Sequence, residues 1–286
     1  MNDDHAPPRP VSIGRAIRTG FRDAYDHMGY VVFATFVSFL CTAAVLSLVF
    51  VVLRSVPGIP LIAQLALMLP VAFVGYICAV GVFYYAGKSA DHEHPAVHDT
   101  LVGIKKLFVP ALGLFVVDAF FMGVLGGDAV LFLAMFTPKG SAVFLALSIL
   151  CAYLSIVSTM MAMYHLPLLV AQLEMESGPR TFVILRKSFL LMADNPGFTV
   201  VLFLVIIAFA VVCALLALVG MALLFLGVCA FLLTHALREL FTKYGILEEE
   251  PEIPEDKPWR LPDSWRRRDS GTPDDEAHGT RGQTDG

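Results

Sequence analysis

An aspartate in the middle of an apolar segment is the residue best placed to carry chemistry. Asp118 lies within Phe115-Val-Val-Asp-Ala-Phe-Phe121, where a bare carboxylate in a bilayer costs several kcal/mol. His165 and His235 lie in other apolar segments and are candidate partners. Two roles remain open for Asp118: a proton or cation site on an internal cavity, or a hydrogen-bonded side chain that joins helices.

A second pattern is a row of small residues at three- and four-residue steps along one apolar segment. Small residues let membrane helices approach closely, and their hydroxyls bond across the interface. We therefore expect a packing face, with a hydroxyl-lined substrate path as the alternative. The row consists of Ser148, Ala152, Ser155, Ser158, Thr159 and Ala162.

Metal-ligating residue types occur in one short polar loop. His92-Glu-His-Pro-Ala-Val-His98 is flanked by Asp91 and Asp99, so His92, His94 and His98 are weak candidates for metal ligands. Such loops are usually solvated, and we expect no metal there. The five cysteines each lie inside an apolar segment without ligand spacing, which indicates small buried hydrophobes and no disulfide.

Recognisable catalytic motifs are missing from the sequence. It contains no phosphate-binding glycine loop, no zinc-protease helix, no nucleophilic serine motif and no pair of membrane aspartates. We expect a protein that is not an enzyme, uses no cofactor and binds no nucleic acid.

The composition predicts the elements that position these residues. Of the 286 residues, 57% are hydrophobic and only 16% are charged, whereas soluble domains are about one quarter charged. The apolar segments are long enough to cross a hydrocarbon core of about 30 Å, which needs roughly 20 helical residues. We predict an all-α integral membrane protein, in contact with the lipid bilayer, with about six transmembrane helices. The predicted spans are 29–53, 60–87, 107–125, 140–173, 197–218 and 221–242.

Glycine and proline set the predicted ends of these spans. Gly126, Gly127 and Asp128 interrupt the third apolar segment, so we expect its span to end near residue 125 and a short interfacial helix to follow. The last apolar segment, 197–242, is about twice as long as the bilayer requires. It should form a hairpin that turns near Val219 and Gly220.

The basic residues predict the orientation. When loops are assigned alternately to two sides, 18 lysines and arginines fall on one side, and only Arg54 and Lys139 fall on the other. Positive charge in short loops marks the cytoplasmic side. Both termini are therefore predicted to be cytoplasmic, in a multi-pass protein of the bacterial inner membrane.

Three basic amphipathic segments precede the predicted hairpins. Residues 12–27, 96–108 and 180–193 each carry an apolar stripe at helical spacing beside arginine or lysine, which is typical of helices in the headgroup plane. They begin about 85 residues apart, so we predict three repeats of a surface helix plus a transmembrane hairpin. Ordinary basic connectors between spans are the alternative.

The ends of the chain differ from this membrane domain, which is predicted to cover residues 12–247. Residues 1–11 are expected to be a flexible tail. Residues 248–286 are rich in Pro, Asp, Glu and Gly and are expected to form a disordered cytoplasmic tail, because they can bury too little apolar area to offset chain entropy.

Three short motifs resemble those of the YesL-like family of bacterial membrane proteins, whose function is undefined. They are Tyr164-His-Leu-Pro-Leu-Leu-Val-Ala-Gln172, Arg186-Lys-Ser-Phe189 and Asn195-Pro-Gly-Phe-Thr199. The resemblance covers roughly residues 12–244. It implies a polytopic bacterial membrane protein, sometimes associated with carbohydrate-uptake systems, and it supplies no catalytic residues.

Two functions follow as expectations. The first is a non-enzymatic accessory or scaffold for another membrane complex, such as a transport system. The second is a secondary transporter or small channel with a central site near Asp118. A polar passage with Asp118 on its wall would favour the second, and tightly packed helices would favour the first.

Overall fold

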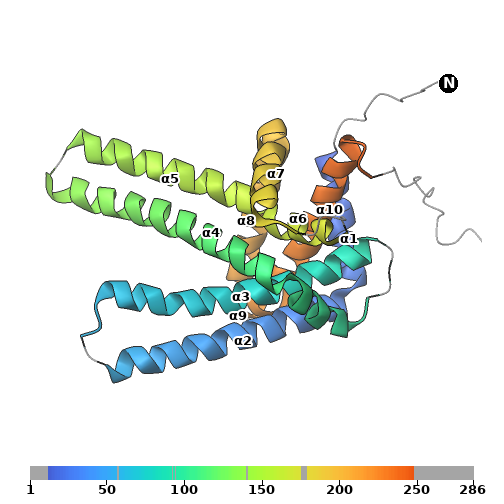
Figure 1. Cartoon of the computed structure of the whole chain (residues 1–286), viewed down its shortest axis with the longest axis horizontal. Helices are drawn as coiled ribbons and strands as arrows, with labels where there is room; N and C mark the ends of the chain where they lie inside the picture. The colour runs from blue at the N-terminus through green and yellow to red at the C-terminus, as the bar shows by residue number, and fades with distance from the viewer. Residues whose placement is uncertain are drawn as a thin grey trace, which may run out of the picture. The chain divides into compact units, whose positions relative to one another are not determined.

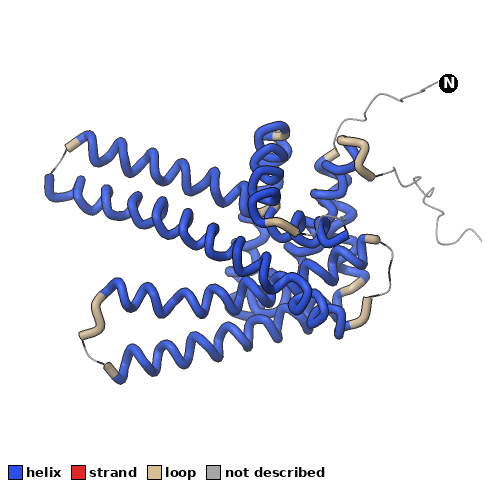
Figure 2. The backbone as a smooth tube through the Cα atoms, in the orientation of Figure 1, coloured by secondary structure: helices blue, strands red, loops and turns tan. Residues whose placement is uncertain are grey.

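Helices dominate the structure because apolar segments in a bilayer must pair their own backbone groups. The computed structural model describes residues 12–56, 58–91, 93, 95–139, 141–174 and 179–247. Figure 2 shows helices joined by short loops throughout this part of the chain, and no strand occurs in it. The helices are α1 (Ile13–Asp26), α2 (Met28–Ser55), α3 (Leu61–Ala90), α4 (Val97–Lys139), α5 (Ala142–Ala162), α6 (His165–Ala171), α7 (Thr181–Asp194), α8 (Pro196–Leu215), α9 (Ala217–Gly220) and α10 (Leu226–Lys243), with a π-helical turn at Met221–Phe225 before α10.

Six helical segments in the described residues are long and apolar enough to cross a membrane. This confirms the prediction of an all-α, multi-pass membrane protein. The six segments are Met28–Ser55, Ala63–Ala90, Val97–Thr137, Ala142–Ala171, Pro196–Leu215 and Met221–Lys243.

Two long hairpins extend from the rest of the bundle (Figure 1). One consists of α2 and α3, and the other of α4 and α5. Large apolar side chains are exposed along their outer halves, among them Leu48, Leu65, Val130 and Val143. Such surfaces face lipid or other helices, since they have nothing to gain from water.

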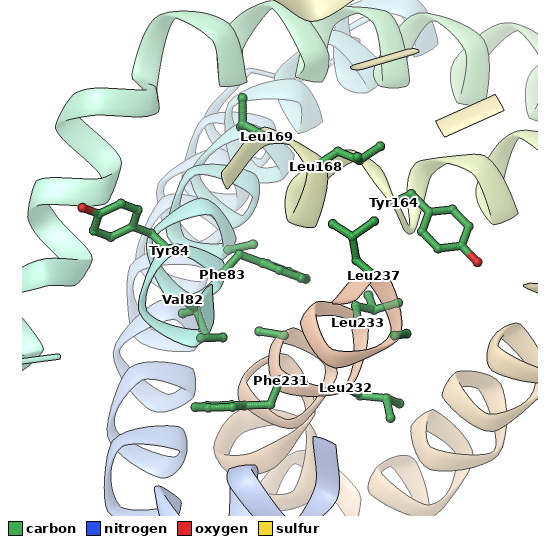
Figure 3. Packing of buried hydrophobic residues seen from close by; sticks show 14 of the residues in the cluster. Val82, Phe83, Tyr84, Tyr164, Leu168, Leu169, Phe231, Leu232, Leu233 and Leu237 are labelled. Atoms are coloured by element: carbon green, nitrogen blue, oxygen red, sulfur yellow. The ribbon is translucent and has the colours of Figure 1, made fainter. Parts of the chain in front are cut away.

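The packed core surrounds α10. This helix is the most buried of the six spans, and it packs against α1, α2, α3 and α6. Figure 3 shows Phe83 of α3, Leu168 of α6 and Leu237 of α10 lying against one another. The end of the bundle at which α3 ends, α4 begins and α10 ends carries most of the described basic residues and is called the basic end below.

The first helix packs on α10 through small residues. Ala16, Gly20 and Ala24 recur every fourth residue and are buried. A Cβ atom on Gly20 would lie 2.9 Å from the Cα atom of Leu232, so only glycine permits this approach. Tyr25 of the same helix, by contrast, is 71% exposed.

The predictions of a middle surface helix over 96–108 and of a third span that ends near residue 125 were wrong. Residues 97–108 are the beginning of α4, which continues to Lys139. The beginning packs along α3, where a Cβ atom on Gly103 would meet the Tyr84 ring at 2.4 Å. Gly126 and Gly127 do not end the helix, because a break inside a bilayer would leave backbone groups unpaired. The threefold repeat therefore fails in its middle unit, although α1 and α7 are separate helices.

The fourth span was predicted to be one helix over 140–173, but the structure divides it into α5 and α6. The chain turns at Met163 and Tyr164, between α5 and α6. Pro167 explains the break: it has no N–H for the carbonyl of Met163, and its ring would clash with that carbonyl in a straight helix.

The predicted hairpin after residue 197 turns at Leu216, slightly earlier than expected. Gly220 then lies against α8. A Cβ atom at this position would be 2.5 Å from the carbonyl oxygen of Cys213, so the absence of a side chain allows the close return of the chain.

Candidate functional site

The structure brings Asp118 and His165 together. Asp118 lies in α4, and His165 is the first residue of α6. Oδ1 of Asp118 is 2.8 Å from Nδ1 of His165. The other carboxylate oxygen accepts a hydrogen bond of 3.3 Å from the hydroxyl of Tyr76 in α3. Three spans thus converge on one carboxylate.

The site lies deep along the spans that form it. Asp118 follows Lys106 by twelve residues, and Tyr76 precedes Lys88 by the same number. At 1.5 Å per residue, both side chains lie about 18 Å along their helices from a lysine of the basic end. A hydrocarbon core is about 30 Å thick, so lysines at the bilayer surface put the site near its centre.

His165 is almost fully buried, with a side chain only 1% exposed, whereas that of Asp118 is 19% exposed. The contact between them is close enough for an ion pair, yet neither ring nitrogen makes a hydrogen bond of acceptable angle with a described residue. A small rotation of the imidazole would align Nδ1 with the carboxylate across this 2.8 Å separation. Nε2 has no hydrogen-bond partner among the described residues.

The break in the fourth span supports this position of His165. The preceding residue, Tyr164, is fully buried, and its hydroxyl lies 2.9 Å from that of Thr199 in α8. The backbone is satisfied locally, since the amide of Met163 bonds to the carbonyl of Thr159 and the amide of Leu168 bonds to that of Tyr164. The turn therefore places two adjacent polar side chains in the interior without leaving these amides unpaired.

A carboxylate beside an imidazole can share and exchange one proton. The hydroxyl of Tyr76 donates to Asp118, and Nε2 of His165 can donate or accept, depending on the ring tautomer. Ionisable groups inside membrane spans commonly mark proton or ion pathways. The arrangement is thus suited to proton binding.

The other candidate histidine contacts a different carboxylate. Nε2 of His235 in α10 lies 2.9 Å from Asp23 of α1, while Nδ1 of His27 lies 3.0 Å from the same side chain. The hydroxyl of Ser89 in α3 donates a 3.4 Å hydrogen bond to Asp23. Burial raises the pKa of Asp23, but the bond and charge of His235, the charge of His27 and the Ser89 bond outweigh it, so the net pKa is lowered.

This second cluster has the residue types of a hydrolase triad but not its arrangement. Ser89 Oγ is 3.3 Å from Nε2 of His27, and Nδ1 of His27 faces Asp23. In a triad, the serine and the carboxylate lie on opposite sides of the imidazole. Here the Ser89 hydroxyl also donates directly to Asp23, at 3.4 and 3.5 Å, so the carboxylate binds the serine as well as the imidazole. The cluster joins α1, α3 and α10.

The small residues of α5 lie partly against α4. Ser148 is buried and donates a 2.8 Å hydrogen bond to the carbonyl of Ala129, and the Thr159 hydroxyl lies 3.6 Å from the sulfur of Met122. Ser155 also approaches Met122, at 4.0 Å. Of the remaining members of the row, Ala152 is exposed, and Ser158 and Ala162 are partly buried.

The loop histidines form no metal centre in the part of the chain that the structure describes. His92 and His94 lie outside the described residues, as do the tails 1–11 and 248–286. His98 is described and exposed in the first turn of α4. No group of three or more His, Cys, Asp or Glu residues among the described positions is arranged to hold a metal ion.

Several residues of these clusters were not singled out in the sequence. Tyr76 and Tyr164 lie within apolar segments, where an aromatic residue gives no signal of a polar role. Asp23 and His27 had a usable signal, because residues four apart share one face of a helix. His235 could not be matched with Asp23 from sequence, since 212 positions separate them.

The fold and the buried site define the class: a polytopic α-helical membrane protein with an interior carboxylate–imidazole pair. Comparisons with protein-family models, with curated proteins and with solved structures find no match.

Proposed function

We propose that this protein is a proton-coupled secondary transporter or small channel whose proton-binding site is Asp118 with His165. The observation that carries this proposal is the 2.8 Å contact between the two side chains, deep along the spans. A single aspartate could equally have been a structural hydrogen-bond donor. An aspartate beside a buried histidine provides two neighbouring groups that can each bind a proton.

The discontinuous fourth span is further support. Membrane transporters form substrate and ion sites where helices are broken, because the freed polar groups line the site. Here the break at Met163 and Tyr164 directly precedes His165. A rearrangement at this break would change the contact between His165 and Asp118, and protonation would in turn favour one of the two arrangements.

Proton flux in proteoliposomes tests the proposal. The wild-type protein, reconstituted with a trapped pH dye under a potassium diffusion potential, should pass protons faster than empty liposomes. Asp118→Asn keeps the size of the side chain and its ability to donate a hydrogen bond, but it cannot bind and release a proton. That variant should lose the flux by at least tenfold, while Asp118→Glu retains part of it.

Asp128→Asn is the matched control, because Asp128 lies in the same helix outside the cluster. It should leave the flux unchanged. The unfolding temperature of each variant in detergent establishes that the protein is folded. Equal flux in wild type, Asp118→Asn and empty liposomes would refute the proposal and favour a structural role for the pair.

A non-enzymatic accessory or scaffold of a membrane complex, such as a transport system, is the second candidate. It is favoured by the outer halves of the two hairpins, where exposed apolar residues such as Leu65, Leu69 and Phe120 offer surfaces to a partner helix. The resemblance to YesL-like proteins points the same way. This function would survive Asp118→Asn, so the flux experiment separates the two candidates.

We also propose that the protein resides in a bacterial inner membrane with the basic end in the cytoplasm. The support is the distribution of lysine and arginine between the two sides, because basic residues are retained in the cytoplasm during insertion.

A further inference from the structure

Helix α7 has two different faces. One face packs on the bundle, where Ile184, Ser188 and Leu191 are buried. The opposite face is exposed and mostly apolar, because it carries large hydrophobic side chains with exposed fractions from 37% to 79%. They are Phe182, Val183, Phe189 and Leu190. Water does not solvate such a face favourably, so in the membrane it lies against lipid or protein.

Arg186 lies at the centre of this apolar face. It follows Phe182 by four residues and precedes Leu190 by four, and residues four apart are neighbours on a helix surface. Arg186 is exposed, and it makes no hydrogen bond or ion pair with another residue in the part of the chain that the structure describes. A guanidinium with five N–H donors is thus surrounded by aromatic and aliphatic side chains.

Contacts at both ends determine the level of α7 along the spans. At one end, Nδ2 of Asn195 donates a 2.7 Å hydrogen bond to the hydroxyl of Tyr244, which directly follows α10 at the basic end. At the other end, a Cβ atom on Gly113 of α4 would lie 2.7 Å from Oγ1 of Thr181. At 1.5 Å per residue, Gly113 is about 10 Å along α4 from Lys106 of the basic end. The helix therefore lies at the depth of lipid headgroups and of the first part of the acyl chains.

We propose that this face of α7 binds an anionic phospholipid, with the lipid phosphate on Arg186 and the acyl chains along Phe182, Phe189 and Leu190. A phosphate supplies the oxygen acceptors that a guanidinium binds in a bidentate manner. Figure 1 shows α7 crossing the direction of α4 and α5, so lipid chains that run along these spans meet α7 from its side. A zwitterionic lipid carries a cationic group beside its phosphate and gains less from Arg186.

The size of the face favours a lipid over a protein partner. The exposed side of a helix of 14 residues is about 21 Å long and about 10 Å wide, which gives an area on the order of 200 Å². Each partner in a standard protein interface buries about 800 Å². The proposal does not depend on proton coupling at Asp118, because lipid binding can be measured without transport.

Native mass spectrometry of the full-length protein in a neutral detergent tests the proposal, because it resolves the first lipid that binds. Dioleoyl phosphatidylglycerol and dioleoyl phosphatidylcholine have the same chains and differ in their headgroups. The first phosphatidylglycerol should bind about tenfold more tightly, since its charge-assisted bonds to Arg186 are not offset by an ammonium group. Glycerol phosphate at the same concentration should not displace it, because it lacks the acyl chains.

Two results of this titration would overturn the proposal. Equal affinity for the two lipids would leave the face to any lipid or to a protein partner. Displacement of phosphatidylglycerol by glycerol phosphate would make Arg186 a site for soluble phosphate esters.

Variants locate the lipid. Arg186→Gln should lower the affinity for phosphatidylglycerol to that for phosphatidylcholine, and Arg186→Lys should retain part of the preference, because lysine keeps the charge but not the bidentate geometry. Arg22→Gln is the matched control, since it removes the same charge from an exposed position on α1. Unfolding temperatures establish that the variants are folded. Equal losses in Arg186→Gln and Arg22→Gln would show that net charge attracts the lipid and would overturn the site on α7, as would an unchanged preference in Arg186→Gln.

Discussion

Asp23 shows how a charged residue is kept at the edge of the membrane domain. It accepts bonds from His235 and Ser89 and lies beside His27, so residues from α10, α3 and the junction of α1 and α2 all meet it. These partners stabilise the ionised carboxylate of Asp23, so its pKa falls below the ordinary value of 3.8. Its charge therefore contributes to folding at neutral pH.

The stabilisation by Asp23 should depend on pH in a defined direction. Because the folded pKa is depressed, the contribution is complete above pH 3.8 and is lost as the pH falls through the lower folded value. We expect Asp23→Asn to destabilise the protein by about 1–2 kcal/mol at pH 7, as for loss of a bond to a charged group. Thermal unfolding in detergent should show this difference shrinking in acid.

The control for this comparison is Asp26→Asn, an exposed carboxylate in the last turn of the same helix. It should change the unfolding temperature little at any pH. A wild-type advantage over Asp23→Asn that grows as the pH falls below 4 would contradict the account of Asp23.

For single residues, the sequence identified the aspartate inside a span but not all of the residues that contact it. Asp118 was visible because an isolated carboxylate in an apolar segment is costly, and His165 was one of its two candidate partners. Which histidine lies beside it depends on the break that Pro167 introduces. Tyr76 could not be found, since its polar role arises only when α3 and α4 are packed together.

Helix packing depends on positions where a side chain is missing. Gly20 of α1 faces the backbone of Leu232 in α10, and backbone cannot move aside as a flexible side chain can. A Cβ atom on Gly14 of the same helix would meet no described residue of another helix within 4 Å. The two glycines lie in the same helix, but only Gly20 is in close contact with α10.

Gly20→Ala should destabilise the protein, whereas Gly14→Ala should not. The added methyl at Gly20 forces α1 away from α10, an overpacking that costs about 1–3 kcal/mol. At Gly14, the same change only raises helix propensity, by up to about 1 kcal/mol. Unfolding temperatures of the two variants in detergent provide the comparison, and equal values would show that α1 does not pack on α10 through Gly20.

The sequence predicted the helices correctly where the length of an apolar segment alone determines where a helix begins and ends. The first two spans and the final hairpin follow from runs of apolar residues bounded by proline or polar residues. The errors arose where a local signal competes with the bilayer. Gly126 and Gly127 would end a helix in water but not in lipid, whereas Pro167 breaks a helix that its apolar length suggested was continuous.

The described helices of the membrane domain form one end rich in basic residues and one end at the hairpin tips. The tips are the connections from α2 to α3 and from α4 to α5. They contain only Arg54 and Lys139 as basic residues. If insertion follows the distribution of positive charge, the basic end stays in the cytoplasm and the tips cross the membrane.

Single cysteines can test this orientation in a background from which the five native cysteines have been removed. Ser55 and Thr137 are exposed near the two tips, and Thr19 is exposed on α1. An impermeant thiol reagent should label Ser55→Cys and Thr137→Cys on intact spheroplasts, because the tips face outward. Thr19→Cys should react only after the membrane is opened. Labelling of Thr19→Cys alone on intact spheroplasts would reverse the orientation.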